Sequence, residues 1–423
     1  MNRSIRIFSV VALIASATGL LADPPEPLEP LQPTSQPARP ATGGAAAKPS
    51  RKITGDLTVT TRPVGKGPKT LRNMLETVRA KYDLPALAGA IVEGNQMVAI
   101  GAVGVRKAGD ETPITVNDQF HLGSCTKAMT ATLVAMLVEQ GKLRWDTTIA
   151  DVFPELAPKM HADYRRVTLE QLLTHRGGVP TDLSAGGLWA RLWRFSGTPT
   201  QARMALLEGV TAQAPHHAPG TTFEYANGGY AIAGAMAERV TGKPWEELLR
   251  TMLFAPLRMN TAGFGAPGNA EAMDQPWGHT IQRGKITPIR PGRKADNPVA
   301  IGPAGTVHAA LADWASFVAL HLIGDQGKGG LLKPESFVKL HAPAPGGDYA
   351  MGWIVTQRPW GGRVLTHAGS NTMWYCVTWI APEKNFAVLV ATNAAGDKCA
   401  QAADEAAWAL IQHYLKGGVG KGK

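Results

Sequence analysis

The chain has 423 residues, of which 44% are hydrophobic and 18% charged, and a formal net charge of +10. This composition predicts a globular protein with one large core or two intertwined ones. The positive charge is dispersed, without a Lys/Arg run interleaved with aromatic residues, so nucleic-acid binding is not expected. The three cysteines, Cys125, Cys376 and Cys399, exclude a disulfide scaffold. Cys376 and Cys399 could pair in an oxidising compartment, although the sequence does not fix their distance.

The first 22 residues have the pattern of an export signal. Arg3 and Arg6 precede an apolar stretch over residues 7–15, and Ala22 is an acceptable cleavage point. The apolar stretch is too short for a stable membrane span. An uncleaved anchor remains the alternative, because Leu20 is unfavourable three residues before the cleavage point. We therefore expect an extracytoplasmic protein, periplasmic or secreted, with no stable membrane span after cleavage.

A proline-rich stretch follows the signal. Residues 23–50 contain eight prolines and almost no large apolar side chains. This composition predicts a linker over residues 23–69, largely disordered, with its last part, 51–69, partly ordered. The folded domain is then expected over 70–415, with a flexible tail at 416–423.

Helix and strand patterns alternate at the start of this domain. An amphipathic helix is predicted over Thr70–Tyr82, followed by a hairpin of two strands, Ala86–Val92 and Met97–Val103. An apolar helix over Ser124–Gln140 ends at Gly141, a favourable helix stop.

The middle of the chain, from about 146 to 340, predicts a mainly helical insertion. Its helices are expected at Leu169–Thr174, Gly229–Val240, Trp245–Leu253 and Ala309–Leu322. Strands return at Ala350–Val355, Arg363–His367, Met373–Ile380 and Phe386–Thr392, before a last helix from about Lys398 to Leu415. The predicted fold class is α+β, of α/β sandwich type. One antiparallel sheet is built from both ends of the chain and flanked by helices, with the helical subdomain inserted.

Three short motifs carry the chemistry, and the first is Ser124-Cys125-Thr126-Lys127 at the start of the apolar helix. Ser124 and Lys127 are three residues apart, so they lie on the same helix face, with the amine within reach of the hydroxyl. This is the Ser-x-x-Lys arrangement of serine acyl-transfer enzymes. On its own, the motif is equally a helix cap followed by a solvated lysine.

The second motif is Tyr225-Ala226-Asn227, between a turn and a helix. Tyr225 can act as a general base if a cation lowers its pKa, and Lys127 is the obvious cation. Asn227 can bind a substrate amide and the lysine. Taken alone, the tripeptide is equally a buried aromatic residue followed by a turn asparagine.

The third motif is His367-Ala368-Gly369-Ser370, at the end of a predicted strand. Gly369 allows close approach of substrate to the strand, and the Ser370 N–H can pair with that of Ser124 as an oxyanion hole. His367 would direct a donor or partial positive charge toward a substrate carboxylate or the Tyr225 oxygen. The alternative is a structural histidine.

Taken in order, the three motifs resemble the serine β-lactamase-like superfamily. The resemblance covers roughly residues 70–415 and, through Tyr-x-Asn, is greatest to the branch of class C β-lactamases, DD-carboxypeptidases, D-aminopeptidases and family VIII esterases. Segments typical of this family are 120–130, 133–146, 172–175, 219–234, 254–259, 301–306 and 351–353.

By this resemblance, Ser124 is the nucleophile, Lys127 its proton partner and Tyr225 the general base and acid. Asn227, His367, Gly369 and Ser370 are implied for substrate binding and the oxyanion. His367 stands where class C β-lactamases usually have lysine, which shifts the expectation from β-lactam turnover toward peptidase or esterase activity.

The predicted function is that of an exported serine hydrolase acting on an ester, amide or β-lactam bond of a small molecule or peptide, with cell-wall peptide as one candidate. The alternative is a catalytically silent penicillin-binding or cell-wall-sensing relative. No cofactor and no metal are expected, since the metallohydrolase motifs are lacking and His216-His217 in a Pro-flanked loop is interpreted as solvent-facing. Specificity is expected from the loops Thr181–Gln201, with Trp189 and Trp193, and Pro267–Asn297, with Trp277, unless these tryptophans are core.

Overall fold

The computed structural model describes residues 60–61, 67–328 and 330–418. The predicted export signal, most of the predicted linker and the end of the tail therefore lie outside the described residues. Within the interval predicted as linker, strand β1 (Thr60–Thr61) and the start of helix α1 (Gly67–Lys81) are formed.

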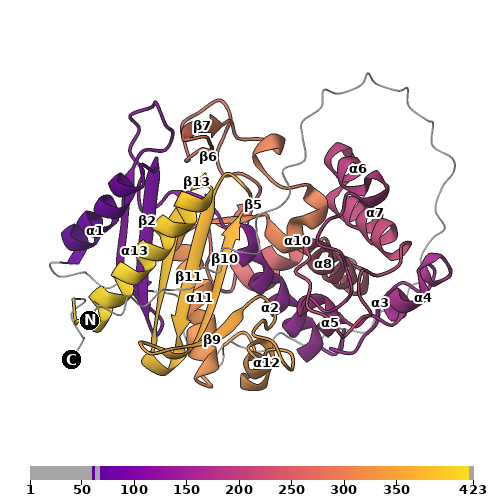
Figure 1. The fold of residues 1–423 in the computed structure, drawn as a ribbon. Coiled ribbons are helices and arrows are strands. Elements are labelled where there is room, and N and C mark those ends of the chain that lie inside the picture. The colour runs from indigo at the N-terminus through magenta and orange to yellow at the C-terminus, as the bar shows by residue number, and fades with distance from the viewer. Residues whose placement is uncertain (1–59, 62–66, 329, 419–423) are drawn as a thin grey trace, which may run out of the picture.

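A seven-stranded sheet with the strand order β1-β3-β2-β12-β11-β10-β9 forms the centre of the fold (Figure 1). Its strands besides β1 are β2 (Ala86–Glu93), β3 (Gln96–Gly104), β9 (Ile354–Arg358), β10 (Gly362–Ser370), β11 (Tyr375–Ala381) and β12 (Phe386–Thr392). The β2–β12 ladder joins the two ends of the chain in antiparallel register, and every other pair is antiparallel except β1–β3. The predicted α+β fold, with one sheet made from both chain ends, is confirmed.

The terminal helices α1 and α13 (Asp397–Leu415) cover one face of this sheet (Figure 1). They pack closely because glycines of the sheet lie beneath them. A Cβ at Gly89 would be 3.0 Å from Leu410 of α13, and one at Gly101 would be 3.2 Å from Leu71 of α1. Larger residues at these two positions would push the helices off the sheet and open the core.

On the other face lie α2 (Thr126–Glu139) and α11 (Leu311–Asp325). Every residue of α2 from Thr126 to Leu137 is buried. The helix therefore has no solvent face, which agrees with its nearly uniform apolar sequence. Because α2 is buried between the sheet and the rest of the molecule, its start, with Lys127 and the preceding Ser124, lies inside the protein rather than on its surface.

The middle of the chain forms a mainly helical lobe beyond α2 (Figure 1). Its helices are α3 (Ile149–Val152), α4 (Ala162–Arg165), α5 (Leu169–Leu173), α6 (Leu188–Arg194), α7 (Pro199–Thr211), α8 (Asn227–Thr241), α9 (Trp245–Leu248), α10 (Gly302–Gly305) and α12 (Pro334–Leu340). None of the helices in the described ranges combines the length and the apolar character that crossing a membrane requires.

Two small sheets also lie partly in this middle region, and the sequence did not predict their strands. One has the order β4-β8-β5, with β4 (Gln119–His121), β8 (Val307–Ala310) and β5 (Gly263–Phe264). The other has the order β13-β6-β7, with β13 (Ala394–Ala395), β6 (Gly278–Gln282) and β7 (Lys285–Ile289). Strands β4, β5 and β13 have only two or three residues, too few for an alternating pattern.

Two predicted elements differ from the structure. The strand expected over Ala350–Val355 begins only at Ile354, because Ala350–Trp353 forms a tight turn in which the Ala350 N–H donates to the Trp353 carbonyl. Gly352, at φ 84°, lies against α2, where a Cβ would be 2.5 Å from the Ala128 backbone. The helix expected over Trp245–Leu253 is α-helical only to Leu248 and continues as a π-helix over Leu249–Phe254.

Candidate active site

Ser124 lies in a single 3₁₀ turn, Gly123–Cys125, that leads into α2. The turn is anchored from beneath, since the Gly123 N–H donates to His121 Nδ1 at 3.1 Å. With Nδ1 accepting, His121 Nε2 donates to Asp296 at 2.6 Å, which fixes the imidazole tautomer. Gly123 has φ 46°, a conformation that favours glycine. Ser124 is 9% exposed.

Lys127 is fully buried and its amine has three neighbours. The Nζ atom lies 3.0 Å from Ser124 Oγ, 2.8 Å from Asn227 Oδ1 and 2.9 Å from the Ala304 carbonyl oxygen. No salt bridge joins this amine to a carboxylate among the described residues. Burial therefore lowers the Lys127 pKa well below its ordinary value, against a small opposing effect of Cys125.

These neighbours fit a neutral amine. The Ala304 carbonyl oxygen and Asn227 Oδ1 can only accept hydrogen bonds, so they take the two N–H groups of an unprotonated Lys127. The third neighbour is Ser124 Oγ, 3.0 Å from Nζ; an ammonium donates to it, and an unprotonated amine accepts from the Ser124 hydroxyl through its lone pair. This is the geometry of a general base positioned on a nucleophile.

Tyr225 and Asn227 reach this amine from the start of α8. Two glycines let α8 approach closely, because a Cβ at Gly229 would be 3.0 Å from the Leu172 carbonyl and one at Gly234 would be 2.4 Å from Pro303. The Tyr225 ring lies 4.6 Å from Lys127 Nζ. The structure thus brings the first two predicted motifs together.

The protonation state of Tyr225 differs from the expectation. Its hydroxyl is buried without a hydrogen bond; Ser124 is near enough to lower the pKa, but burial dominates and raises it above its ordinary value. Because Lys127 is favoured as a neutral amine, it does not supply the cation needed to depress that pKa. Burial thus favours the neutral Tyr225 phenol, which can donate a proton, and the group next to the Ser124 hydroxyl is the Lys127 amine.

The end of β10 brings Gly369 and Ser370 against the Ser124 turn. A Cβ at Gly369 would lie 2.0 Å from the Leu122 carbonyl and 2.9 Å from the Ser124 backbone nitrogen, and one at Gly123 would lie 2.3 Å from the Ser370 nitrogen. Only glycines permit this contact. The backbone segments bearing the Ser124 and Ser370 N–H groups are therefore neighbours, as an oxyanion hole requires.

His367 is placed differently from the expectation. Its Nδ1 lies 2.6 Å from the Ala368 carbonyl, to which it donates, and its Nε2 lies 3.1 Å from the Tyr349 hydroxyl, from which it accepts. Both ring nitrogens of His367 therefore bind groups within the protein, and the side chain is buried. Its ring centroid lies 6.4 Å from that of Tyr225.

Three residues of the site were not predicted. Tyr349 binds His367, the Ala304 carbonyl binds Lys127, and His175 stacks on Tyr225 with ring centroids 4.3 Å apart. The Nδ1 of His175 accepts from the Ala226 N–H, and its Nε2 is buried without a partner. His175 and Ala304 lie in segments typical of the family, and this was the one feature of the sequence that could have pointed to them as site residues. Tyr349 lies just before such a segment and carried none.

The two loops predicted to set specificity are joined to each other. Arg293 donates to the Trp193 carbonyl at 2.7 Å. Trp189 and Trp193 of α6 pack edge to face. The Lys107 Nζ atom lies 4.6 Å from the centroid of the Trp277 ring. Thr181, the first residue of one loop, donates through its hydroxyl to the Tyr225 carbonyl. At least this end of the loop is therefore connected to the catalytic motif.

The cysteines are free thiols in the structure. Cys376 contacts Cys125, with the sulfur atoms 3.6 Å apart, and the structure forms no Cys376–Cys399 bridge. Cys125, which directly follows Ser124, is buried.

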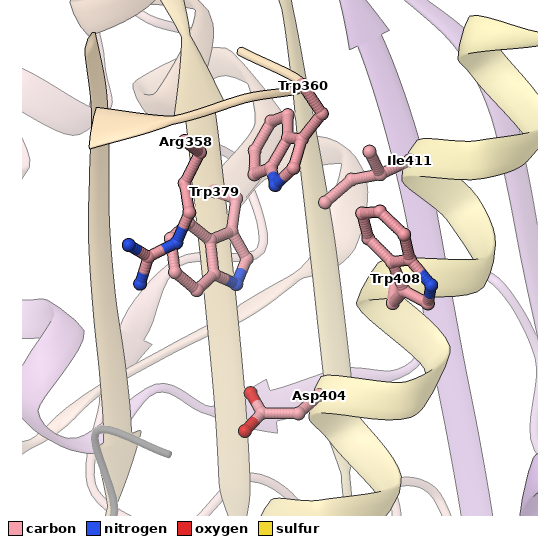
Figure 2. Close-up of a pocket in the computed structure, with 6 residues that line it drawn as sticks. All are labelled: Arg358, Trp360, Trp379, Asp404, Trp408 and Ile411. Atoms are coloured by element: carbon pink, nitrogen blue, oxygen red, sulfur yellow. The ribbon is translucent and has the colours of Figure 1, made fainter. Parts of the chain in front are cut away.

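A pocket with polar and aromatic walls lies on the α13 face of the sheet, opposite the face that α2 covers (Figure 2). It is lined by Arg358, Trp360, Trp379, Asp404, Trp408 and Ile411. The Arg358 guanidinium lies 5.4 Å from the Trp379 ring centroid, and burial raises the pKa of Asp404 to about 6. None of the predicted catalytic residues lines it.

Comparison with protein families gives one match over most of the chain. The profile of the Beta-lactamase family matches residues 71–412. The chain is 30% identical to penicillin-binding protein 4 of Amycolatopsis lactamdurans over 248 residues, which are 58% of this chain and 62% of that protein. It is 24% identical to penicillin-binding protein 4* of Bacillus subtilis, over 71% of this chain and 66% of that protein. The chain thus spans about two thirds or less of these relatives' lengths.

Solved structures share the fold. A D-stereospecific amidohydrolase from Streptomyces superposes with a TM-score of 0.63 at 20% identity, over 80% of this chain and 98% of that one. D-alanine carboxypeptidase AmpC from Burkholderia cenocepacia gives a TM-score of 0.63 at 19% identity, over 81% and 99% of the two chains.

Proposed function

Since this chain belongs to the β-lactamase family, we propose that it is a serine hydrolase that forms an acyl-enzyme on Ser124 and cleaves an ester or amide bond. The observation that carries the proposal is the Lys127 amine, which is buried without a countercharge and lies 3.0 Å from the Ser124 hydroxyl. A buried lysine at this distance from a serine forms no ion pair that would stabilise the fold. Acyl transfer, in contrast, requires a base beside the nucleophile.

In the acylation step, Ser124 Oγ attacks the substrate carbonyl carbon while its proton moves to Lys127 Nζ. The carbonyl oxygen becomes negative beside the Ser124 and Ser370 N–H groups. The Tyr225 hydroxyl donates a proton to the leaving amine or alkoxide, and the Lys127 ammonium, now charged, stabilises the phenolate it leaves. The proton then passes from Lys127 to Tyr225, which restores both groups.

Deacylation runs through the same groups in reverse. Tyr225 first passes its proton to Lys127 Nζ, the phenolate takes a proton from the attacking water molecule, and Ser124 Oγ leaves with the proton from Lys127. Asn227 holds the amine in place through its Oδ1 in both half-reactions.

For the substrate, we propose an ester, or the amide of a D-amino acid, in preference to a β-lactam. The position usually held by lysine carries His367, whose two nitrogens are bound to Tyr349 and the Ala368 carbonyl. The site therefore has no lysine ammonium there to bind a substrate carboxylate. The activity named for the Streptomyces structure, D-stereospecific amide hydrolysis, fits such a site.

The test is intact-mass spectrometry of wild type and Ser124→Ala after mixing with a fluorophosphonate, a penicillin, a p-nitrophenyl ester and a D-amino-acid amide. We expect a covalent adduct on wild type alone, with turnover of the ester or the D-amide and little of the penicillin. A trapped penicillin adduct that is not released would instead favour the penicillin-binding alternative. Turnover retained in Ser124→Ala would exclude the assignment.

We also propose that the protein acts outside the cytoplasm, on the basis of the export pattern in residues 1–22. N-terminal sequencing of the protein expressed in a bacterial host should find a chain that begins at Asp23. An intact N-terminus on cytoplasmic protein would reject this proposal.

A further inference from the structure

Outside the catalytic residues, three potential metal ligands converge at the segment that carries Tyr225. They are His216, His217 and Glu224, and their ligand atoms all lie within 4.8 Å of one another. His216 Nδ1 is 2.8 Å and His217 Nε2 is 3.3 Å from the same atom, Glu224 Oε2. The expectation that these histidines simply face solvent is therefore incomplete, because a carboxylate from farther along the chain lies against both.

The spacing is that of ligands around one small ion. Zinc bonds of about 2.0–2.1 Å in a tetrahedral arrangement place neighbouring ligand atoms about 3.3 Å apart. The distance from His217 Nε2 to Glu224 Oε2, 3.3 Å, matches that value, and the distance from His216 Nδ1, 2.8 Å, is that of a hydrogen bond and lengthens when an ion enters. Two imidazole nitrogens and one carboxylate oxygen are a ligand set that zinc uses.

The carboxylate is held in place for this role. The other oxygen, Glu224 Oε1, accepts the Thr181 N–H at 2.8 Å, which leaves Oε2 toward the two imidazoles. The Glu224 N–H donates to the His175 carbonyl, and the His216 N–H donates to the Gly178 carbonyl. Both ends of the ligand set are thus fixed by backbone hydrogen bonds, so binding requires little rearrangement.

The site is also accessible. The side chains of His216 and His217 are 62% and 41% exposed, whereas that of Glu224 is 15% exposed. An ion can enter from solvent, and a water molecule can complete the coordination.

We propose that His216 Nδ1, His217 Nε2 and Glu224 Oε2 bind one divalent zinc ion. The ion joins the loop at 216–217 to the residue immediately before Tyr225. Since Thr181 binds both Glu224 and the Tyr225 carbonyl, the ion fixes the backbone that positions this tyrosine. Its role is structural, and hydrolysis remains the work of Ser124 and Lys127.

The experiment is a zinc titration of the full chain without a histidine tag, by isothermal calorimetry, together with cobalt substitution followed by visible absorption. We expect one zinc ion per chain, a rise in Tm with zinc, and intense cobalt bands typical of a tetrahedral site. His216→Ala and His217→Ala should each weaken binding at least about tenfold, which is the lower end for loss of even an outer-shell partner.

Two controls separate this site from others. His413→Ala, which removes a histidine of the last turn of α13, should bind zinc as wild type does. Ser124→Ala should do the same, so that zinc binding is judged independently of the proposed hydrolysis. No saturable binding at a several-fold excess of zinc, or unchanged affinity in both His216→Ala and His217→Ala, would overturn the proposal.

Discussion

Two buried polar groups lie along helix α2 and differ in how their charges are balanced. The first is the Ser124–Lys127 group, in which the lysine has no carboxylate and the Tyr225 hydroxyl and His175 Nε2 have no partner. The second lies further along the helix at Thr132. We call it the histidine chain: Thr132, His321, His341, Asp325 and Arg363.

Each titratable member of the histidine chain has a partner. Thr132 Oγ1 lies 3.0 Å from His321 Nε2, His321 Nδ1 lies 2.9 Å from His341 Nε2, and His341 Nδ1 lies 2.8 Å from Asp325 Oδ1. Arg363 donates to the same carboxylate oxygen at 2.6 Å. The Thr132 hydroxyl also donates to the Ala128 carbonyl at 2.8 Å, and the chain ties α2, α11, α12 and β10 together.

The contrast teaches how to tell a reactive buried cluster from a structural one. Both clusters are buried and rich in hydrogen bonds, so burial alone does not distinguish them. The reactive cluster is the one left incomplete, because a substrate and its transition state supply the missing partners. In the histidine chain a single polar atom, Arg363 Nη1, is buried without a partner among the described residues, and the bonded remainder contributes rigidity.

The variant Lys127→Met tests the contrast between the two clusters most directly, because it keeps the bulk of the side chain and removes the amine. Acylation of Ser124 by a p-nitrophenyl ester should fall about 10³–10⁴-fold, since the serine loses its base. In wild type, acylation should slow as the pH falls and Lys127 becomes protonated. Because the pKa of Lys127 is lowered, we expect this loss at a lower pH than for an ordinary lysine, with activity at neutral pH. The measurement is the pH profile of single-turnover acylation.

The control for Lys127→Met is Lys142→Met, at an exposed position after α2. It should acylate as wild type does. A Lys127→Met protein that acylates within threefold of wild type would show that the amine is not the base.

Two tyrosines of the same cluster allow a matched pair. Tyr225→Phe removes a hydroxyl that has no hydrogen bond, so activity should fall about 10²–10³-fold while the free energy of unfolding changes by less than about 0.5 kcal/mol. Tyr230→Phe removes a hydroxyl that donates to the Leu173 carbonyl at 2.7 Å, so stability should fall by about 1–2 kcal/mol with little change in activity. Urea unfolding and ester turnover measure both; equal stability losses would contradict the contrast.

In the histidine chain, Asp325→Asn should cost about 3 kcal/mol of unfolding free energy. The change leaves Arg363 and His341 without the carboxylate that both contact. Turnover measured well below the melting temperature should stay near that of wild type, because no member of the chain touches Ser124. A large loss of activity in folded protein would mean that the two clusters are coupled through α2.

The histidine chain should also give the stability a pH dependence. Burial lowers the pKa of both His321 and His341, so the unfolded chain takes up protons at these residues at a higher pH than the folded protein does. Stability is therefore fully present above about pH 6.5 and is lost as the pH falls below it, by at most about 1.4 kcal/mol per pH unit for each histidine. Urea unfolding between pH 7.5 and 5 measures the slope, which should be shallower in His341→Gln. Equal slopes would contradict the assignment.

Much of the fold and the three motifs could be predicted from the sequence. The hairpin β2–β3 and the last helix carry long periodic patterns, the helix after Ser124 is a long apolar run, and the one-turn spacing of Ser124 and Lys127 is a local property. The β9 boundary was wrong because Gly352 turns the backbone against α2, a contact made across the fold.

The electrostatics of the site could not be predicted in the same way. Whether Lys127 has a countercharge depends on Asn227 and Ala304, which are distant in sequence and meet it only in the folded protein. The expectation that Lys127 would depress the Tyr225 pKa assumed a charged amine, and the structure favours a neutral one. Similarly, no local pattern in the sequence shows that the Tyr349 hydroxyl lies in hydrogen-bond contact with His367 Nε2.

The shared sheet also has a consequence for biosynthesis. Strands β2 and β3 leave the ribosome early, but β12, which covers the open edge of β2, is made only near the end of translation. At about 5–20 residues per second the nascent hairpin exposes that apolar edge for tens of seconds. A chaperone that holds the growing chain is therefore an expected requirement for its yield, and a message truncated before β12 should give insoluble product rather than a smaller active enzyme.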